Sequence, residues 1–126
     1  MSEKFYIEII SPEEKIFASE TSEAILPSYE DQMTLLKDHI SIITFLRPGI
    51  IVVEEEKFFI EEGTVEFSDN KLLILSASAK NVKNLNNEEI NEKKKDAVTK
   101  LSATSIRDKE KYLLSHKVDT LNELSR

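Results

Sequence analysis

The sequence contains no cysteine, which excludes disulfide bonds, thiolate metal sites and cysteine nucleophiles. Histidine is nearly as scarce: His39 and His116 are the only two, so a metal site built from several histidines of one chain is effectively excluded. No apolar run approaches the roughly 18 residues of a membrane-spanning helix, and the first residues show neither a signal-peptide core nor an Arg-rich transit pattern. These absences predict a soluble protein of a reducing compartment and argue against thiol or metal catalysis.

Negative charge dominates the composition. The 126 residues carry 24 acidic side chains against 17 Lys and Arg, a formal net charge of −7. Such an excess disfavours unaided binding to nucleic-acid phosphates or to anionic lipids. We therefore expect no nucleic-acid partner and no direct insertion into lipid. The length fits one ordinary domain, or one small domain with an appendage.

The composition shifts along the chain. Residues 1–84 have a net charge of −8, whereas residues 85–126 have a net charge of +1. Every Gly and Pro lies before residue 64, and eight of the nine aromatic residues lie before residue 68. A shift of this kind marks a structural boundary. We predict an N-terminal β-sandwich domain at residues 1–84 and a C-terminal helical hairpin at residues 85–126.

Before residue 84 the apolar residues repeat with a period of two, which is typical of strands with one buried face. The turns between them are frequent: Ser11-Pro12-Glu13, a type II turn at Pro48-Gly49, and Ser68-Asp69-Asn70. This pattern predicts a β-sandwich or flattened barrel of about ten short strands. The clearest strands are expected at residues 4–10, 16–17, 23–26, 40–46, 50–54, 57–61, 65–67 and 71–76, the pair 50–54 and 57–61 forming a hairpin.

After residue 84 the period becomes helical. Asn86 followed by Glu89 resembles a capping box, and Ser105 with Asp108 is expected to cap a second helix. Two antiparallel helices of this length are marginal alone in water, so the hairpin must pack on the sandwich or on another protein, or alternate between them. The expected apolar seam comprises Ile90, Ala97, Val98, Leu101, Ile106, Leu113, Leu114, Val118, Leu121 and Leu124.

Polar residues that could suggest chemistry have simpler interpretations. His39 follows Asp38, but no nucleophile or second metal ligand accompanies it, so a structural or contact role is expected. His116 is expected to be solvated. The acidic runs at residues 54–56 and 61–62 predict a solvated edge, because adjacent strand residues point to opposite faces. The lysines at residues 93–95 predict a solvated helix face with pairs such as Glu89–Lys93.

Four segments, taken in their order and spacing, resemble one known family. One of these segments, residues 30–49, ends in a histidine, an apolar strand and Pro-Gly. The family has Gly-His-x-Pro, an apolar strand and Pro-Gly at the same place. The chain resembles the epsilon subunits of F-type ATP synthases, the counterparts of the mitochondrial delta subunit. The resemblance implies a ten-strand sandwich followed by two helices. The segments are IEIISPE at 7–13, EDQMTLLKDHISIITFLRPG at 30–49, EEGTVEF at 61–67 and LLILSASA at 72–79.

The resemblance implies a non-catalytic subunit of the rotor's central stalk and no enzyme activity of its own. Its partners would be the gamma subunit, the loops of the membrane c-ring and the alpha/beta catalytic head, at the cytoplasmic face of a bacterial inner membrane. The hairpin would fold onto the sandwich, or extend along gamma and obstruct ATP hydrolysis. The implied gamma contacts are Ser11, His39, Ser41 and Thr44; the implied ring-facing loop is Tyr29, Glu30, Asp31 and Gln32; the implied basic face of the second helix is Arg107, Lys109, Lys111 and Lys117.

The chain departs from the family pattern in two respects. Asp31, Thr34, Asp38 and Glu62 stand where the family usually has glycine, and Lys37 and Ser41 where it has proline, so we expect a changed loop geometry around His39. Some members bind ATP on the hairpin through a motif like Ile-Asp-x-x-Arg-Ala. Here the matching segment is LNNEEI at residues 85–90, with Glu89 in place of the arginine. We expect no cofactor and no ATP binding on the hairpin.

Two other classes of protein remain open at this point. One is an unrelated β-sandwich recognition module that dimerises through Leu113, Val118, Leu121 and Leu124. The other is a small enzyme of cupin-like shape, which would need several inward histidine and glutamate ligands.

Overall fold

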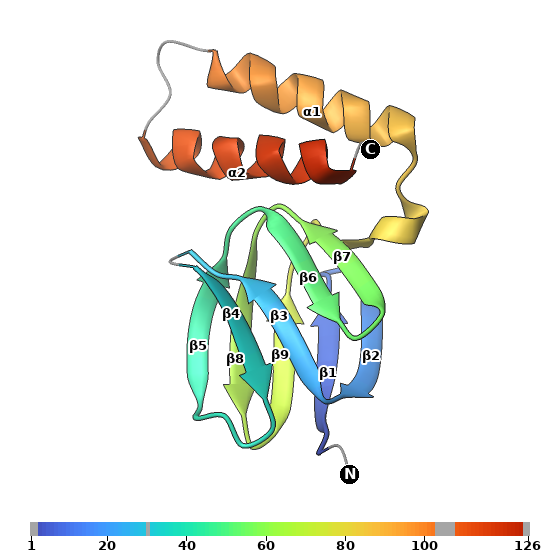
Figure 1. Cartoon of the computed structure of the whole chain (residues 1–126), viewed down its shortest axis with the longest axis vertical. Coiled ribbons are helices and arrows are strands. Elements are labelled where there is room, and N and C mark those ends of the chain that lie inside the picture. Colours follow the sequence, from blue (N-terminus) through green and yellow to red (C-terminus); the bar gives the residue numbers. More distant parts are fainter. Residues whose placement is uncertain (1–2, 30, 103–107, 125–126) are drawn as a thin grey trace.

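Two five-stranded sheets and a helical hairpin make up the computed structural model, which describes residues 3–29, 31–102 and 108–124 (Figure 1). The prediction of a β-sandwich followed by two C-terminal helices is confirmed. The first sheet has the order β2 (Lys15–Thr21), β1 (Phe5–Ile10), β9 (Lys71–Leu75), β8 (Gly63–Ser68), β5 (Ile42–Leu46). The second has the order β10 (Lys80–Asn81), β7 (Glu56–Ile60), β6 (Gly49–Val53), β3 (Glu23–Pro27), β4 (Gln32–Leu36).

Alternating side chains from both sheets build the main core. In β1, Phe5, Ile7 and Ile9 are buried between the sheets, as their spacing predicts. Val65 and Phe67 of β8 join them, while Glu66 between them is exposed. Neighbouring strands are antiparallel except β1 and β9, which run parallel and place Ile7 opposite Leu72. Strands distant in sequence are thus brought together because each has one apolar face to bury.

The expected hairpin at residues 50–61 is present as β6 and β7. In β7, the consecutive residues Phe58 and Phe59 point to opposite sides of the second sheet. Phe58 packs in the main core, and Phe59 packs against the helices. The second sheet is therefore covered by apolar contacts on both sides at this strand.

The predicted type II turn at Pro48-Gly49 is wrong. A type II turn needs a positive φ at its second central residue, and Gly49 has none; it is the first residue of β6. Glycine is required there for space: a Cβ atom on Gly49 would lie 2.6 Å from Cβ of Pro27. The strand β4 was also not predicted, because only Leu35 among its residues is fully buried and the alternation is weak.

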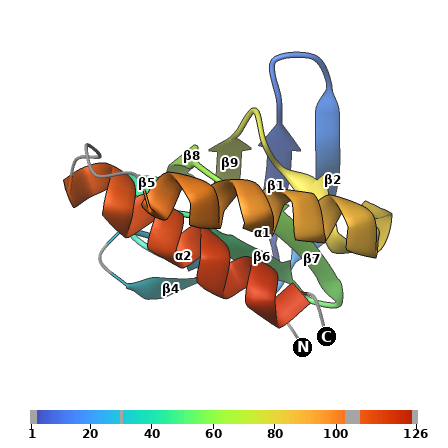
Figure 2. The same cartoon turned by 90° about the horizontal axis from the view of Figure 1, so that it is seen from above.

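Two antiparallel helices, α1 (Asn87–Leu101) and α2 (Asp108–Leu124), lie across one end of the sandwich (Figures 1 and 2). The chain reaches them through a short 3-10 helix, η1 (Val82–Asn84). Asn86 caps α1 as predicted, its side-chain oxygen accepting a hydrogen bond of 2.8 Å from the Glu89 backbone. The expected cap at Ser105 and the expected seam residue Ile106 lie outside the described residues.

The expected apolar seam of the hairpin is mostly buried or half-buried in the described helices, and Ala97 is fully buried. Ile90 of α1 and Leu121 of α2 are buried with Phe59 in a small cluster of their own. Val98, expected in the seam, is 44% exposed. The expected pair Glu89–Lys93 is also wrong: Glu89 binds Lys80 of β10 at 2.7 Å, and Lys93 lies 3.8 Å from Glu61.

Candidate interaction surfaces

Apolar side chains line the outer side of the first sheet. Ile43 is 71% exposed, Phe45 59% and Leu75 46%. Pairing across the sheet connects Phe45 to Thr64, Thr64 to Leu75, and Leu75 to Ile10. Exposed apolar patches of this kind mark protein-docking sites more often than scattered single residues do. We call the set Ile10, Ile43, Phe45, Leu73 and Leu75 the outer apolar face.

Sequence reasoning missed this face, although a signal for it was present. Residues 40–46 are apolar at almost every position, on both faces of the expected strand. A strand that is buried on both sides has such a sequence, but in the described part of the chain the helices lie across one end of the sandwich and leave the outer side of this sheet exposed (Figure 1). Only the tertiary structure shows that the outward half of this strand is exposed.

The four implied gamma contacts are spread over the first sheet. Ser11 follows β1 at the end of the sheet where Ile10 pairs with Leu75, and its hydroxyl accepts a hydrogen bond of 3.1 Å from the backbone of Glu14. His39 lies at the opposite end of the sheet, in the β4–β5 loop. Ser41 directly precedes β5 and is exposed like Ile43 and Phe45, whereas Thr44 is half-buried on the other side of the strand. The structure therefore brings Ser41 to the outer apolar face but not Thr44.

The loop around His39 is held by a pair of hydrogen bonds. Asp38 has a φ of 65°, so it keeps the left-handed conformation that a glycine would adopt readily. Its backbone N–H donates to Oδ1 of Asn70 at 2.6 Å, and Asn70 Nδ2 donates to Asp38 Oδ1 at 3.0 Å. The His39 ring is half-buried edge-on against Phe67, with centroids 5.9 Å apart. The two hydrogen bonds with Asn70 thus stabilise Asp38 in a left-handed conformation, at a position where the family usually has glycine.

The loop implied to face the c-ring lies beneath α2 in this conformation. Ser28 donates a hydrogen bond of 2.5 Å to the carbonyl of Asp31 and so tightens the loop, and Asp31 in turn accepts one of 2.7 Å from the backbone of Gln32. The Tyr29 ring stacks on Tyr112 of α2, with centroids 6.0 Å apart, and the Tyr112 hydroxyl donates to the Tyr29 carbonyl. Glu30 lies outside the described residues.

The implied basic residues of α2 do not share one environment. Lys109 and Lys111 are exposed, and Lys109 lines a hollow of about 580 Å³ together with Phe45 and Leu75 of the outer apolar face. The Lys117 side chain is only 12% exposed and pairs with Glu61. Arg107 lies outside the described residues. Glu61 was expected at a solvated edge, and that prediction is wrong because the turn it occupies lies directly under the helices.

The prediction that His116 is solvated is also wrong. Its ring is half-buried edge-on against Tyr112, with centroids 4.6 Å apart, and it lines a groove with Arg47 and Asp119. Burial lowers the pKa of His116 below its usual value, and the nearby positive charge of Arg47 lowers it further, while Asp119 acts in the opposite direction.

Across residues 3–29, 31–102 and 108–124, no group of three or more His, Asp or Glu side chains is placed to hold a metal ion. In the same part of the chain, no helix is long and apolar enough to cross a membrane. The features that stand out are an exposed apolar sheet face and a hairpin docked by few contacts. Together they define the class of the protein as a β-sandwich with an exposed apolar sheet face and a docked C-terminal helical hairpin.

Comparisons with known proteins identify the family. Residues 4–82 match the family model described as "ATP synthase, Delta/Epsilon chain, beta-sandwich domain". The ATP synthase epsilon chain of Pelagibacter ubique is 40% identical, covering 99% of this chain and 100% of its own length. That of Hyphomonas neptunium is 25% identical over 98% of this chain and 96% of its own. The chain therefore belongs to the family of ATP synthase epsilon chains, subunits of the F-type ATP synthase, as the sequence resemblance implied.

Solved structures show the same fold at low sequence identity. A chain of the Euglena gracilis mitochondrial ATP synthase, described with F1 and the c-ring, matches with a TM-score of 0.78 at 17% identity, over 98% of this chain and 82% of that one. A chain from the Tetrahymena thermophila mitochondrial enzyme, described as central stalk and c-ring, matches with a TM-score of 0.61 at 14% identity, over 99% and 98%. Family membership sets aside both an unrelated recognition module and a cupin-like enzyme.

Proposed function

We propose that this chain is a non-catalytic subunit of the rotor's central stalk, which links the gamma subunit to the c-ring and transmits torque by protein contact alone. It would act as a peripheral component of the complex at the cytoplasmic face of a bacterial inner membrane. Membership of the epsilon-chain family supports this proposal. The single observation that carries it here is the outer apolar face. Burying this exposed apolar surface against a partner protein would lower the free energy of the complex.

We assign the outer apolar face to the gamma subunit. Phe45 and Ile43 project outward from an edge strand, and aromatic residues in such positions are frequent hot spots of binding free energy. Ser41 directly precedes β5 and is also exposed, and His39 precedes it in the chain. The ring-facing role of the loop at Tyr29, Asp31 and Gln32 stays a proposal, as does a role for Lys109 and Lys111 toward the catalytic head.

The first test is co-expression with the cognate gamma subunit, followed by size-exclusion chromatography with mass detection. We expect a one-to-one complex. Phe45→Lys should weaken it by about 2 kcal/mol, the lower bound usual for a hot spot. Val98→Lys is the matched control, because Val98 is also an exposed apolar residue but lies on α1. A chain that ignores gamma, or equal loss of binding in both variants, would refute the assignment.

We also propose that the hairpin does not sense ATP through the family motif. Glu89 stands at the motif's arginine position, and its carboxylate binds Lys80, so a negative group occupies the place where phosphate would need a cation. Isothermal titration of the full chain with ATP and Mg²⁺ should give no heat of binding. Measurable 1:1 binding that Glu89→Arg leaves unchanged would contradict this account.

A further inference from the structure

The hairpin is docked on the sandwich by a small apolar cluster and by the stacking of Tyr112 on Tyr29. The buried part of the cluster consists of one side chain from each element: Phe59 from β7, Ile90 from α1 and Leu121 from α2. It is separate from the main core between the two sheets. Because hydrophobic stabilisation scales with the apolar area removed from water, the docked position needs support from polar contacts.

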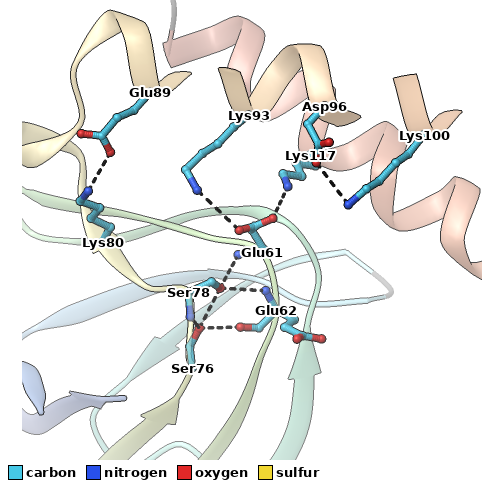
Figure 3. A network of polar contacts seen from close by, with 10 residues as sticks. All are labelled: Glu61, Glu62, Ser76, Ser78, Lys80, Glu89, Lys93, Asp96, Lys100 and Lys117. Atoms are coloured by element: carbon cyan, nitrogen blue, oxygen red, sulfur yellow. Dashed lines mark hydrogen bonds and ion pairs between the residues drawn. The ribbon is translucent and has the colours of Figure 1, made fainter. Parts of the chain in front are cut away.

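One carboxylate provides such support to both helices at once. Glu61 lies in the turn between β7 and β8, directly below the hairpin (Figure 3). Its Oε1 pairs with Nζ of Lys117 from α2, and its Oε2 lies 3.8 Å from Nζ of Lys93 from α1. A carboxylate has two acceptor oxygens, and here each is directed to a different helix.

The turn that carries Glu61 is itself fixed by two serines. Ser78 Oγ accepts a hydrogen bond of 2.9 Å from the backbone N–H of Glu61. Ser76 Oγ donates one of 2.6 Å to the carbonyl of Glu62, and the two hydroxyls lie 3.2 Å apart (Figure 3). The backbone of the turn is therefore fixed in place, so less backbone freedom is lost when the lysines bind the carboxylate.

Burial makes the contact to α2 the stronger of the two. The Lys117 side chain is 12% exposed, whereas that of Lys93 is 35% exposed. Solvent and salt screen an ion pair less when it is partly buried, and a buried charge that loses its partner is unfavourable. Neutralising Glu61 would leave two lysine charges facing the sandwich without this carboxylate. A second bridge, Lys80 to Glu89, holds only α1.

We propose that Glu61 is an electrostatic latch that sets the equilibrium between the docked and released hairpin. Since α1 and α2 also pack on each other, loss of this one carboxylate shifts the whole hairpin toward the released state, while the contacts of Glu89 and Tyr112 with the sandwich remain. Release is promoted by ionic strength and by any partner whose negative charge competes for Lys117 and Lys93. The latch would supply a physical basis for the regulatory role that the family resemblance implies for the hairpin, and it rests on that role, but docking is a property of the isolated chain and can be measured without gamma.

The test is hydrogen exchange with mass spectrometry on the full chain carrying Glu61→Gln, which keeps the shape and removes the charge. Glu62→Gln is the matched control: it is the neighbouring residue in the same turn, changes the net charge equally, and forms no ion pair with the described part of either helix. We expect amide exchange in α1 and α2 to accelerate about tenfold in Glu61→Gln, between the effects of exposed and buried ion pairs. The strands of the first sheet should be unchanged, and Glu62→Gln should match the wild type.

Salt and a double-mutant cycle provide the second measurement. Raising NaCl from about 0.05 M to about 0.5 M should accelerate helix exchange in the wild type and have less effect in Glu61→Gln. Glu61→Gln and Lys117→Gln should each accelerate amide exchange in the helices, and the double variant should exchange more slowly than the product of the two accelerations predicts. Equal exchange in Glu61→Gln and Glu62→Gln, equal loss of protection in sheets and helices, or independent effects in the cycle would each overturn the latch. Failure of gamma binding in the wild type would instead count against the proposed function alone.

Discussion

At the scale of single residues, Gly49 is fixed by the close approach of Pro27. Its backbone conformation suits any residue, but a Cβ would lie 2.6 Å from Cβ and 2.8 Å from Cγ of Pro27, both in a rigid ring. Gly49→Ala should therefore lower the free energy of unfolding by about 1 to 3 kcal/mol, the usual effect of overpacking. Chemical denaturation of the full chain measures this directly.

Gly63→Ala is the comparison for that variant. The nearest atoms to its added Cβ would be the Leu75 carbonyl at 3.0 Å and Ser76 Cβ at 3.3 Å, so the crowding is milder. We expect a smaller loss of stability than for Gly49→Ala. The reverse order would show that crowding against the Leu75 carbonyl is harder to relieve than crowding against the Pro27 ring.

His116 gives the docked hairpin a dependence on pH. Because burial and Arg47 lower the pKa of His116, the docked state favours the neutral ring, and protonation favours release. The stabilisation is intact above the unfolded pKa of about 6.5 and declines as the pH falls below it. Intrinsic amide exchange rises with pH, so the comparison uses protection factors: those of α2 should be lower at pH 5.5 than at pH 8, and the difference should shrink in His116→Gln. His39→Gln, at the other end of the sandwich, should keep the full difference.

At the scale of elements, we expect the hairpin to undock while the sandwich remains folded. Leu121 is fully buried in the small cluster with Phe59 and Ile90, and takes no part in the core between the sheets. Leu121→Asp should therefore abolish protection of α1 and α2 while the strands stay protected, since burying a carboxylate there is unfavourable. Val98→Asp, at an exposed site on α1, is the control and should have little effect. Uniform loss of protection in both variants would contradict the separation of the two units.

At the scale of the whole molecule, we expect residues 1–84 to fold without the hairpin. The main core is made entirely from strands and Ala79, so truncation after residue 84 leaves it complete. The fragment should show a cooperative thermal transition and a β-type circular dichroism spectrum. It exposes Phe59 and Ile50, so Phe59→Lys should improve its solubility without changing the spectrum. A fragment without a cooperative transition would place the domain boundary elsewhere.

The local features of this protein follow from its sequence. Alternation of Phe5, Ile7 and Ile9 specifies a strand with one buried face, and Asn86 specifies the start of α1, because both depend on residues close together in the chain. The ordered motifs, taken together, were sufficient to indicate the family. These signals need no knowledge of which strand lies beside which.

The features decided by tertiary structure all depend on residues far apart in the chain. The outer apolar face is exposed because the helices cover one end of the sandwich and not the outer side of the first sheet, and Gly49 is required because Pro27 lies against it. In the sequence, Glu61 is one of several glutamates that are expected to be solvated. Tertiary packing places it under two helices, where it pairs with a lysine from each. The spacing of residues along the chain determines which faces of the strands and helices are apolar. What each face contacts is determined only by the packing of the sheets and the hairpin, because the free energy of folding depends on all these contacts together.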